Sequence, residues 1–156
     1  MYYIVDDLIH QRKIVSFLKN KKIKIIIDIG AHKGEFLKAV SKIESAEKVY
    51  SLEPQKKIYK KLLEKTDAKR NKAYNLAISN KEGQKKLSIN KLSMTSTFSK
   101  VKKKSKYYRV KKFIVGNQKV FEKVKVKKLD NFVKMIKIKN KIDLLKIDTE
   151  GHVFKL

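Results

Sequence analysis

The fold of this chain is decided by the stretch Lys24-Ile25-Ile26-Ile27-Asp28-Ile29-Gly30-Ala31-His32-Lys33-Gly34-Glu35-Phe36. Its apolar run, Ile23–Ile29, is short and rich in β-branched residues, which is typical of a strand buried on both faces of a parallel sheet. Two glycines four residues apart follow the run, and glycine allows a sharp turn and the close approach of a ligand. An amphipathic segment begins near Gly34. The stretch therefore predicts a strand, a glycine-rich turn and a helix whose N-terminus faces that turn.

The spacing Asp-x-Gly-x-x-x-Gly favours a nucleotide-type ligand at the carboxyl end of the sheet. It is neither the G-x-G-x-x-G dinucleotide fingerprint nor a P-loop, and this difference argues against a pyrophosphate ligand. Asp28 at the end of the strand instead suits a ligand that carries a positive group, such as an amino acid moiety. The alternative is a βα turn that contains glycines and binds nothing.

Composition limits the class of protein. A chain of 156 residues forms one domain with one core. The absence of cysteine excludes disulfides, thiolate metal sites and cysteine nucleophiles. No apolar run approaches the roughly 20 residues of a membrane span, and the segment Met1–His10 lacks the basic start of a signal peptide. We therefore expect a cytoplasmic protein with no membrane span.

The net charge of +26 favours anionic partners. The basic residues are nearly all lysine, however, and only Arg12, Arg70 and Arg109 are arginine, which nucleic-acid readers tend to use for bidentate contacts. Two interpretations stay open. The lysines form a solvated surface that reflects codon usage, or clusters such as Lys102–Lys104 bind anionic partners non-specifically.

Hydrophobic periodicity predicts the remaining elements. Strands are expected over residues 23–29, 48–53, 73–78, 84–90, 107–115, 120–129 and 142–148, and helices over 2–19, 35–43, 55–65 and 131–138. Helix 55–65 is expected to begin at Pro54 or just after it and to turn Ile58, Tyr59, Leu62 and Leu63 inward. Asp130 is expected to cap helix 131–138.

The second strand ends in Glu53. An acid roughly 20 residues after a glycine-rich turn, at the end of the second strand, is where a ribose diol is bound. A carboxylate suits this role because it can accept hydrogen bonds from both hydroxyls. The alternative is an acid favoured by the dipole of the next helix. We favour the ribose interpretation because Glu53 pairs with the first turn.

Three expected strands end in an acid, and a glycine-rich turn follows the first, which resembles the class I S-adenosylmethionine-dependent methyltransferases. More narrowly, the chain resembles the FkbM family. The resemblance rests on Asp28–Gly34, Leu52-Glu53-Pro54, Ala77-Ile78-Ser79 with Gly83, Val126–Leu129 with Asp130, and Leu145–His152. These segments occur in the family's order between residues 23 and 152, and Lys-Ile-Asp-x-Glu-Gly in the last one is the most family-specific.

The resemblance implies an α/β Rossmann-like sheet flanked by helices and S-adenosyl-L-methionine as the methyl donor. Family members typically methylate hydroxyl groups of sugars or natural products, so a glycan or small-molecule acceptor is expected. The periodicity of the first residues predicts an N-terminal packing helix within 1–22, ahead of a methyltransferase domain over 23–156. A complete sheet of this class has three more strands, so on the order of 60–90 further residues are expected, and strand 142–148 is expected to be an uncovered edge.

The resemblance also implies roles for particular residues. The residues that would hold the amino acid part of the cofactor are Asp28, Gly30, Ala31 and Gly34. Glu53 would bind the ribose, and Ala77 and Ile78 would lie near the adenine. Asp148 would face the methyl group, and either Asp148 or His152 is the candidate that accepts the proton of an acceptor hydroxyl. The alternative for Asp148 is a turn residue after the strand, and the alternative for His152 is a surface side chain. We assign no metal ligand.

Two other functions stay open from the sequence. One is a basic nucleic-acid-binding protein or a relative of RNA methyltransferases, because Tyr107, Tyr108 and Phe113 are interleaved with lysines. The other is an inactive, truncated fragment that keeps the first motifs of the family.

Overall fold

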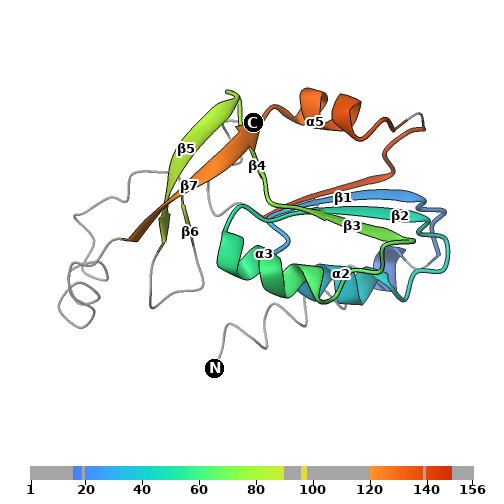
Figure 1. The fold of residues 1–156 in the computed structure, drawn as a ribbon. Coiled ribbons are helices and arrows are strands. Elements are labelled where there is room, and N and C mark those ends of the chain that lie inside the picture. Colours follow the sequence, from blue (N-terminus) through green and yellow to red (C-terminus); the bar gives the residue numbers. More distant parts are fainter. Residues whose placement is uncertain (1–15, 19, 90–95, 98–119, 139, 149–156) are drawn as a thin grey trace, which may run out of the picture.

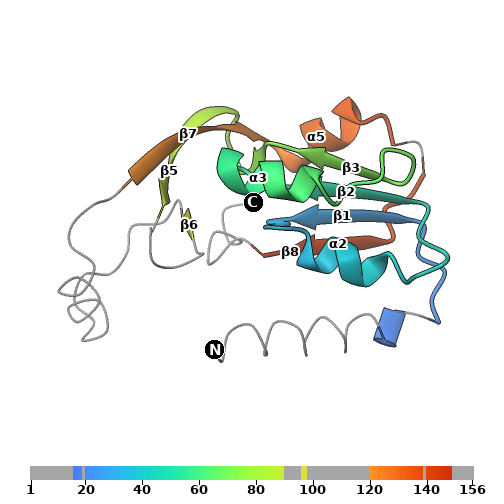
Figure 2. The ribbon, with the colours of Figure 1, turned by 60° about the horizontal axis from the view of Figure 1, so that its bottom comes forward.

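The computed structural model of the chain describes residues 16–18, 20–89, 96–97, 120–138 and 140–148. Within these residues the backbone forms two four-stranded sheets, which Figures 1 and 2 show lying end to end rather than stacked. The chain is an α/β fold with a parallel central sheet between helices. This confirms the fold class that the family resemblance implies.

The first sheet is parallel throughout and has the strand order β3-β2-β1-β8. Its strands are β1 (Ile25–Ile29), β2 (Lys48–Leu52), β3 (Asn71–Tyr74) and β8 (Leu144–Ile147). Every residue of β1 is buried, as its run of isoleucines predicts. Among the described residues β8 forms one edge of this sheet, in line with the expected edge strand.

Helices cover both faces of the first sheet. Figure 1 shows α2 (Glu35–Val40) and α3 (Lys56–Leu63) on one face and α5 (Leu129–Met135) on the other. The side chains of β1 alternate accordingly, since Ile26 packs in the cluster with Phe36 of α2, whereas Ile27 packs with Phe132 of α5. Asp28, two residues after Ile26, therefore lies on the face that α2 covers.

The second sheet is mixed and has the strand order β4-β7-β5-β6. Its strands are β4 (Ala77–Ile78), β5 (Gly83–Ile89), β6 (Ser96–Thr97) and β7 (Val120–Lys127). β5 runs antiparallel to both of its neighbours, which confirms the antiparallel strand expected over 84–90. One face of the β5–β7 pair buries Leu87, Val124 and Val126, and the other exposes lysines.

The single strand expected over residues 73–78 is wrong. β3 ends at Tyr74, and β4 begins at Ala77 in the other sheet. Between them the N–H of Leu76 donates to the carbonyl of Tyr74 at 3.0 Å, and the side chain of Asn75 donates to two carbonyls beyond β2. These bonds turn the backbone out of the first sheet, so the second sheet starts at the carboxyl edge of the first.

Two smaller expectations are also wrong. Leu63 is exposed, whereas Leu62 is buried and Tyr59 packs against the same cluster. The start of the helix is as expected, since α3 begins at Lys56 after the N-cap Gln55, just after Pro54. Asp130 lies within the first turn of α5, whose N-cap is Lys128, and it makes no side-chain cap.

The other expected elements occur with bounds that are shorter or shifted by a few residues, apart from two. Strand 107–115 lies outside the described residues, as does most of helix 2–19 and of the N-terminal unit over 1–22. Residues 16–18 are helical, and Leu18 packs into the cluster beneath α2. In the part of the chain that the structure describes, no helix is long and apolar enough to cross a membrane.

Candidate functional site

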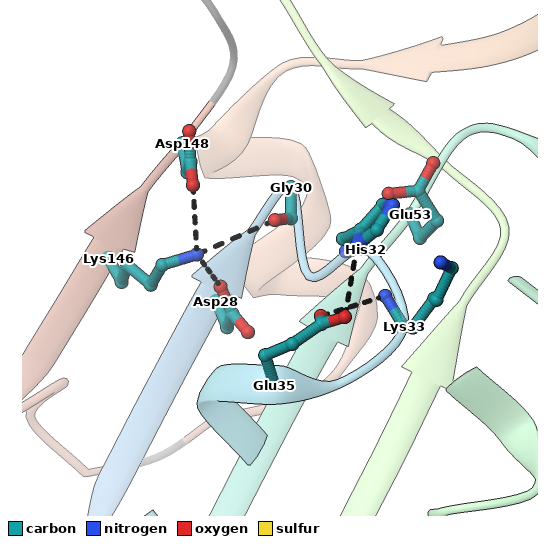
Figure 3. Close-up of polar contacts among 8 residues, drawn as sticks. All are labelled: Asp28, Gly30, His32, Lys33, Glu35, Glu53, Lys146 and Asp148. Carbon is teal, nitrogen blue, oxygen red and sulfur yellow. Dashed lines mark hydrogen bonds and ion pairs between the residues drawn. The ribbon is translucent and has the colours of Figure 1, made fainter. Parts of the chain in front are cut away.

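Three acids meet at the carboxyl edge of the first sheet. Asp28 lies in β1, Glu53 follows β2 and Asp148 follows β8, and Figure 3 shows them around the turn that begins at Gly30. Parallel strands end at the same edge of a sheet, so residues far apart in the chain are neighbours here. The structure thus brings together the acids expected from the ends of the strands.

Asp28 is buried and forms an ion pair with Lys146. The two residues lie directly opposite each other in the β1–β8 register, and Lys146 Nζ lies 3.0 Å from Asp28 Oδ1. Asp28 is fully buried, whereas the Lys146 side chain is 20% exposed. Burial raises the pKa of Asp28 although the neighbouring ammonium opposes the shift.

The second oxygen of Asp28 is buried and lacks a hydrogen-bond partner among the described residues. Ser51, which lies opposite Asp28 in the β1–β2 register, has a buried hydroxyl oxygen in the same condition. An unsatisfied buried oxygen is costly and calls for an explanation. These two oxygens therefore mark the end of β1 as part of the candidate site.

Gly30 allows the close approach of β8 to the turn. Its φ is +81°, and a Cβ at this position would lie 2.0 Å from the backbone carbonyl oxygen of Asp148. The N–H groups of Gly30 and Ala31 both donate to the carbonyl of Leu52, at 3.0 and 2.9 Å. The turn is thereby fixed against the ends of β2 and β8 at once, and only glycine fits its first position.

The turn continues over Glu53. The N–H of His32 donates to Glu53 Oε2 at 3.1 Å, and the N–H of Gln55 donates to Glu53 Oε1 at 2.8 Å. Burial raises the pKa of Glu53, although these two hydrogen bonds oppose the shift. Each carboxylate oxygen keeps a second lone pair, so the Glu53 carboxylate is held in place and can still accept from hydroxyl groups of a ligand.

Gly34 and Glu35 complete the turn at the start of α2. Gly34 is the N-cap with φ +81°. Glu35 accepts hydrogen bonds from His32 Nδ1 and from the N–H of Lys33, both at 3.1 Å. Burial alone would raise the pKa of Glu35, but the hydrogen bond with His32, a backbone hydrogen bond from its own N–H and the charges of His32 and Lys65 together lower that pKa. His32 Nε2 is buried without a partner among the described residues.

Asp148 is the exposed member of the site. Its side chain is 64% exposed, and its Oδ2 lies 3.8 Å from Lys146 Nζ. The other candidate proton acceptor, His152, lies outside the described residues. Asp148 is therefore the candidate that the structure brings to the turn, and its catalytic role stays a prediction.

Ala77 and Ile78 are both buried in β4 of the second sheet. Ile78 packs in the cluster with Ile27 and Phe132. Their expected place near an adenine stays a prediction. Among the described residues, no three His, Cys, Asp or Glu side chains are grouped to hold a metal ion.

Four residues of the site carry no signal of a role in the sequence: Lys146, His32, Glu35 and Asn75. Aligning the acids that end the strands would have placed Asp28 opposite Asp148, so only the observed register reveals the lysine. Asn75 holds the backbone of Glu53 and Pro54 through hydrogen bonds of 2.9 and 2.8 Å to their carbonyls. Nothing in the local sequence signals that role, because Asn75 reaches across from the end of β3.

The site is rich in hydrogen-bond acceptors. Its carboxylates outnumber its cations, in a chain whose net charge is +26. It suits a ligand that carries positive charge and hydroxyl groups and that fits beside a glycine turn.

A protein-family model matches this chain. The model of the Methyltransferase FkbM domain matches residues 28–155, which is nearly the whole chain. Searches of the curated proteins and of the solved structures found no match.

Proposed function

The chain belongs to the FkbM methyltransferase domain family, and we propose that it transfers the methyl group of S-adenosyl-L-methionine to a hydroxyl of a sugar or another small molecule. The observation that carries this proposal is the meeting of Asp28 and Glu53 around the turn from Gly30 to Gly34 (Figure 3). This arrangement fits both ends of the cofactor.

The residues of the site match the cofactor's chemistry. A ribose offers two hydroxyls, and the Glu53 carboxylate is held by backbone N–H groups with lone pairs to spare. The amino acid end of the cofactor carries an ammonium and a carboxylate. The ion pair of Lys146 and Asp28 supplies one group of each charge at the end of β1. Gly30 leaves no side chain between the turn and β8. Asp28, Gly30, Ala31 and Gly34 would thus form the amino acid side of the site, and Glu53 the ribose side.

S-adenosyl-L-methionine supplies a methyl group on a positively charged sulfur, so the donor arrives activated. The protein then has mainly to hold and align the reactants. Asp148 is our candidate to accept the proton of the acceptor hydroxyl, because its exposed carboxylate stands at the edge of the turn.

A thermal melt of the 156-residue chain with and without S-adenosylhomocysteine tests the proposal. Ligand at 100 times its dissociation constant stabilises a folded site by about 2.7 kcal/mol, so the melting temperature should rise. Asp28→Ala and Glu53→Ala should each melt cooperatively without ligand and lose this rise. Glu47→Ala removes an exposed carboxylate paired with Lys24 and should keep it.

A cooperative wild-type melt that ligand does not move would count against the proposal. So would a rise that survives both changes, because the two carboxylates would then lie outside the binding site.

A further inference from the structure

Lys146 has one strong contact and two weak ones. Its ammonium lies 3.0 Å from Asp28 Oδ1, 3.5 Å from the carbonyl oxygen of Gly30 and 3.8 Å from Asp148 Oδ2. Only the first is a good hydrogen bond, and the last is too long for one. An ammonium has three N–H donors, so two of them are only loosely engaged toward the turn and β8.

The Lys146 ammonium is held in place by residues of β1 and α2. Asp28 anchors it from β1, and the ring of Phe36 in α2 lies 5.4 Å away on the same side. Figure 3 shows the Lys146 side chain reaching between Asp28, Gly30 and Asp148. Asp28 is fully buried, whereas Lys146 is partly exposed. Lys146 is therefore the member of the pair that can meet a ligand, and Asp28 acts through it.

The contact with Asp148 is easily exchanged. Asp148 is mostly exposed, and ion pairs of exposed carboxylates contribute little because water screens them. A ligand carboxylate that enters between Lys146 and Asp148 is screened less by water than Asp148 is, so its attraction to Lys146 is stronger. It accepts hydrogen bonds from the two loosely engaged N–H donors of Lys146.

From this geometry we infer that Lys146 binds the α-carboxylate of the cofactor's amino acid end, with Asp28 as the residue that positions it. The inference rests on the proposed function and refines it, because it separates a carboxylate contact from the rest of the site. It also assigns to the Asp28–Lys146 pair a preference for nucleosides that carry a complete amino acid.

Three thioether ligands distinguish contacts to the ligand's carboxylate from contacts to its ammonium. S-adenosylhomocysteine carries an ammonium and a carboxylate, 5′-(3-aminopropyl)thioadenosine carries the ammonium alone, and 5′-methylthioadenosine carries neither. Titration calorimetry of each with the full chain measures their affinities. In Lys146→Met the affinity for S-adenosylhomocysteine should fall about tenfold to a hundredfold, as expected for a lost charge-assisted hydrogen bond. The affinities for the two carboxylate-free ligands should stay at the wild-type level.

Two further variants test whether the charge of Lys146 is what the carboxylate binds. Lys146→Arg keeps the charge and should recover part of the lost affinity. Lys127→Met removes a lysine that pairs with Glu82 at 3.7 Å in the second sheet, and it should leave all three affinities unchanged.

The Lys146→Met change leaves Asp28 buried without a cation, so this variant can fail to fold. The comparison is then made between Asp28→Asn and Asp28→Asn/Lys146→Met, in which no buried carboxylate is left unpaired. The double variant should bind S-adenosylhomocysteine more weakly than Asp28→Asn and bind the carboxylate-free ligands equally well.

Equal losses for all three ligands, or no loss for S-adenosylhomocysteine, would overturn the inference while leaving the proposed function intact. Tighter binding of S-adenosylhomocysteine by Lys146→Met would also overturn it, since Lys146 would then compete with the ligand's ammonium. A wild-type chain that binds none of the three would instead remove the proposed function itself.

Discussion

The two sheets of this chain use charge in opposite ways. At the carboxyl edge of the first sheet, four of the chain's 15 acids, Asp28, Glu35, Glu53 and Asp148, surround one turn. On the open face of the second sheet, Lys86 and Lys123 lie directly opposite each other, and Lys125 lies opposite Gln84.

The difference lies in burial rather than in the number of charges. Asp28 and Glu53 are buried, and each has a defined partner. Lys86, Lys123 and Lys125 are exposed, so water and salt screen them. The +26 net charge of the chain therefore says little about the candidate site, whose chemistry depends on a few buried carboxylates.

The largest contrast between the two sheets should come from their glycines. Gly30→Ala places a Cβ 2.0 Å from the carbonyl oxygen of Asp148 at φ +81°, and backbone cannot move aside as a side chain can. We expect a loss of about 4 kcal/mol in the free energy of unfolding, from left-handed strain and overpacking together. Urea denaturation measures this loss.

Gly83→Ala is the matched control in the second sheet. Its φ is +114°, but a Cβ there would meet nothing within 4 Å. Gly83→Ala should lower the free energy of unfolding by only about 1–2 kcal/mol, because the backbone strain acts there without a steric clash. Equal losses for the two variants would mean that the contact between the turn and β8 contributes nothing.

Asn75 should matter more than an exposed amide of the second sheet. Asn75→Ala leaves the carbonyls of Glu53 and Pro54 without their donor, so we expect a loss of about 2 kcal/mol. We also expect weaker binding of S-adenosylhomocysteine, because the backbone of Glu53 loses its support. Gln84→Ala, on the exposed face, should change stability by less than about 0.5 kcal/mol. If the two variants behaved alike in urea, Asn75 would have no supporting role.

The pH dependence of stability should reveal the buried acids of the first sheet. Burial raises the pKa of Asp28 above its ordinary 3.8 and that of Glu53 above its ordinary 4.5. The folded state thus binds these protons more tightly than the unfolded state does. Their contribution to stability is full below the ordinary values and is lost as the pH rises through the raised ones. In ligand-free Asp28→Asn, stability should therefore fall less steeply over that range than in the wild type.

Asp143 provides the opposite case. Hydrogen bonds from the N–H groups of Ile25 and Lys24 lower its pKa. Its contribution is present above 3.8 and is lost as the pH falls through the lowered value, so Asp143→Asn should weaken the protein at neutral pH. Melting curves at several pH values test both variants, and identical slopes for Asp28→Asn and the wild type would contradict the burial argument.

The smallest effect should come from the lysine face. Lys123→Glu replaces a like-charge pair with Lys86 by an opposite-charge pair, and we expect a gain of about 0.5 kcal/mol. The gain should disappear in about 1 M salt, where charges are screened beyond roughly 3 Å. Binding of S-adenosylhomocysteine should not change. A large change in that binding would show that the two regions are coupled.

Much of the site could be predicted because it lies where strands end. The isoleucine run before Asp28, the acid before Pro54 and the apolar run before Asp148 each indicate a strand terminus locally. Parallel strands end at one edge, so these acids could be placed together from the sequence. The split at Asn75 could not be predicted, because residues 73–78 read as one strand and the bonds that divide them depend on carbonyls of Glu53, Pro54 and Tyr74.

The sequence by itself determined the order of strands and helices, the glycine turn and the acids that follow the strands, because hydrophobic periodicity and backbone freedom act over a few residues. Only the tertiary structure decided which charges meet. The pairing of Lys146 with Asp28 depends on the β1–β8 register across 118 positions of sequence. No hairpin turn joins these two strands to fix their register, so the packing of the whole sheet and its helices decides it.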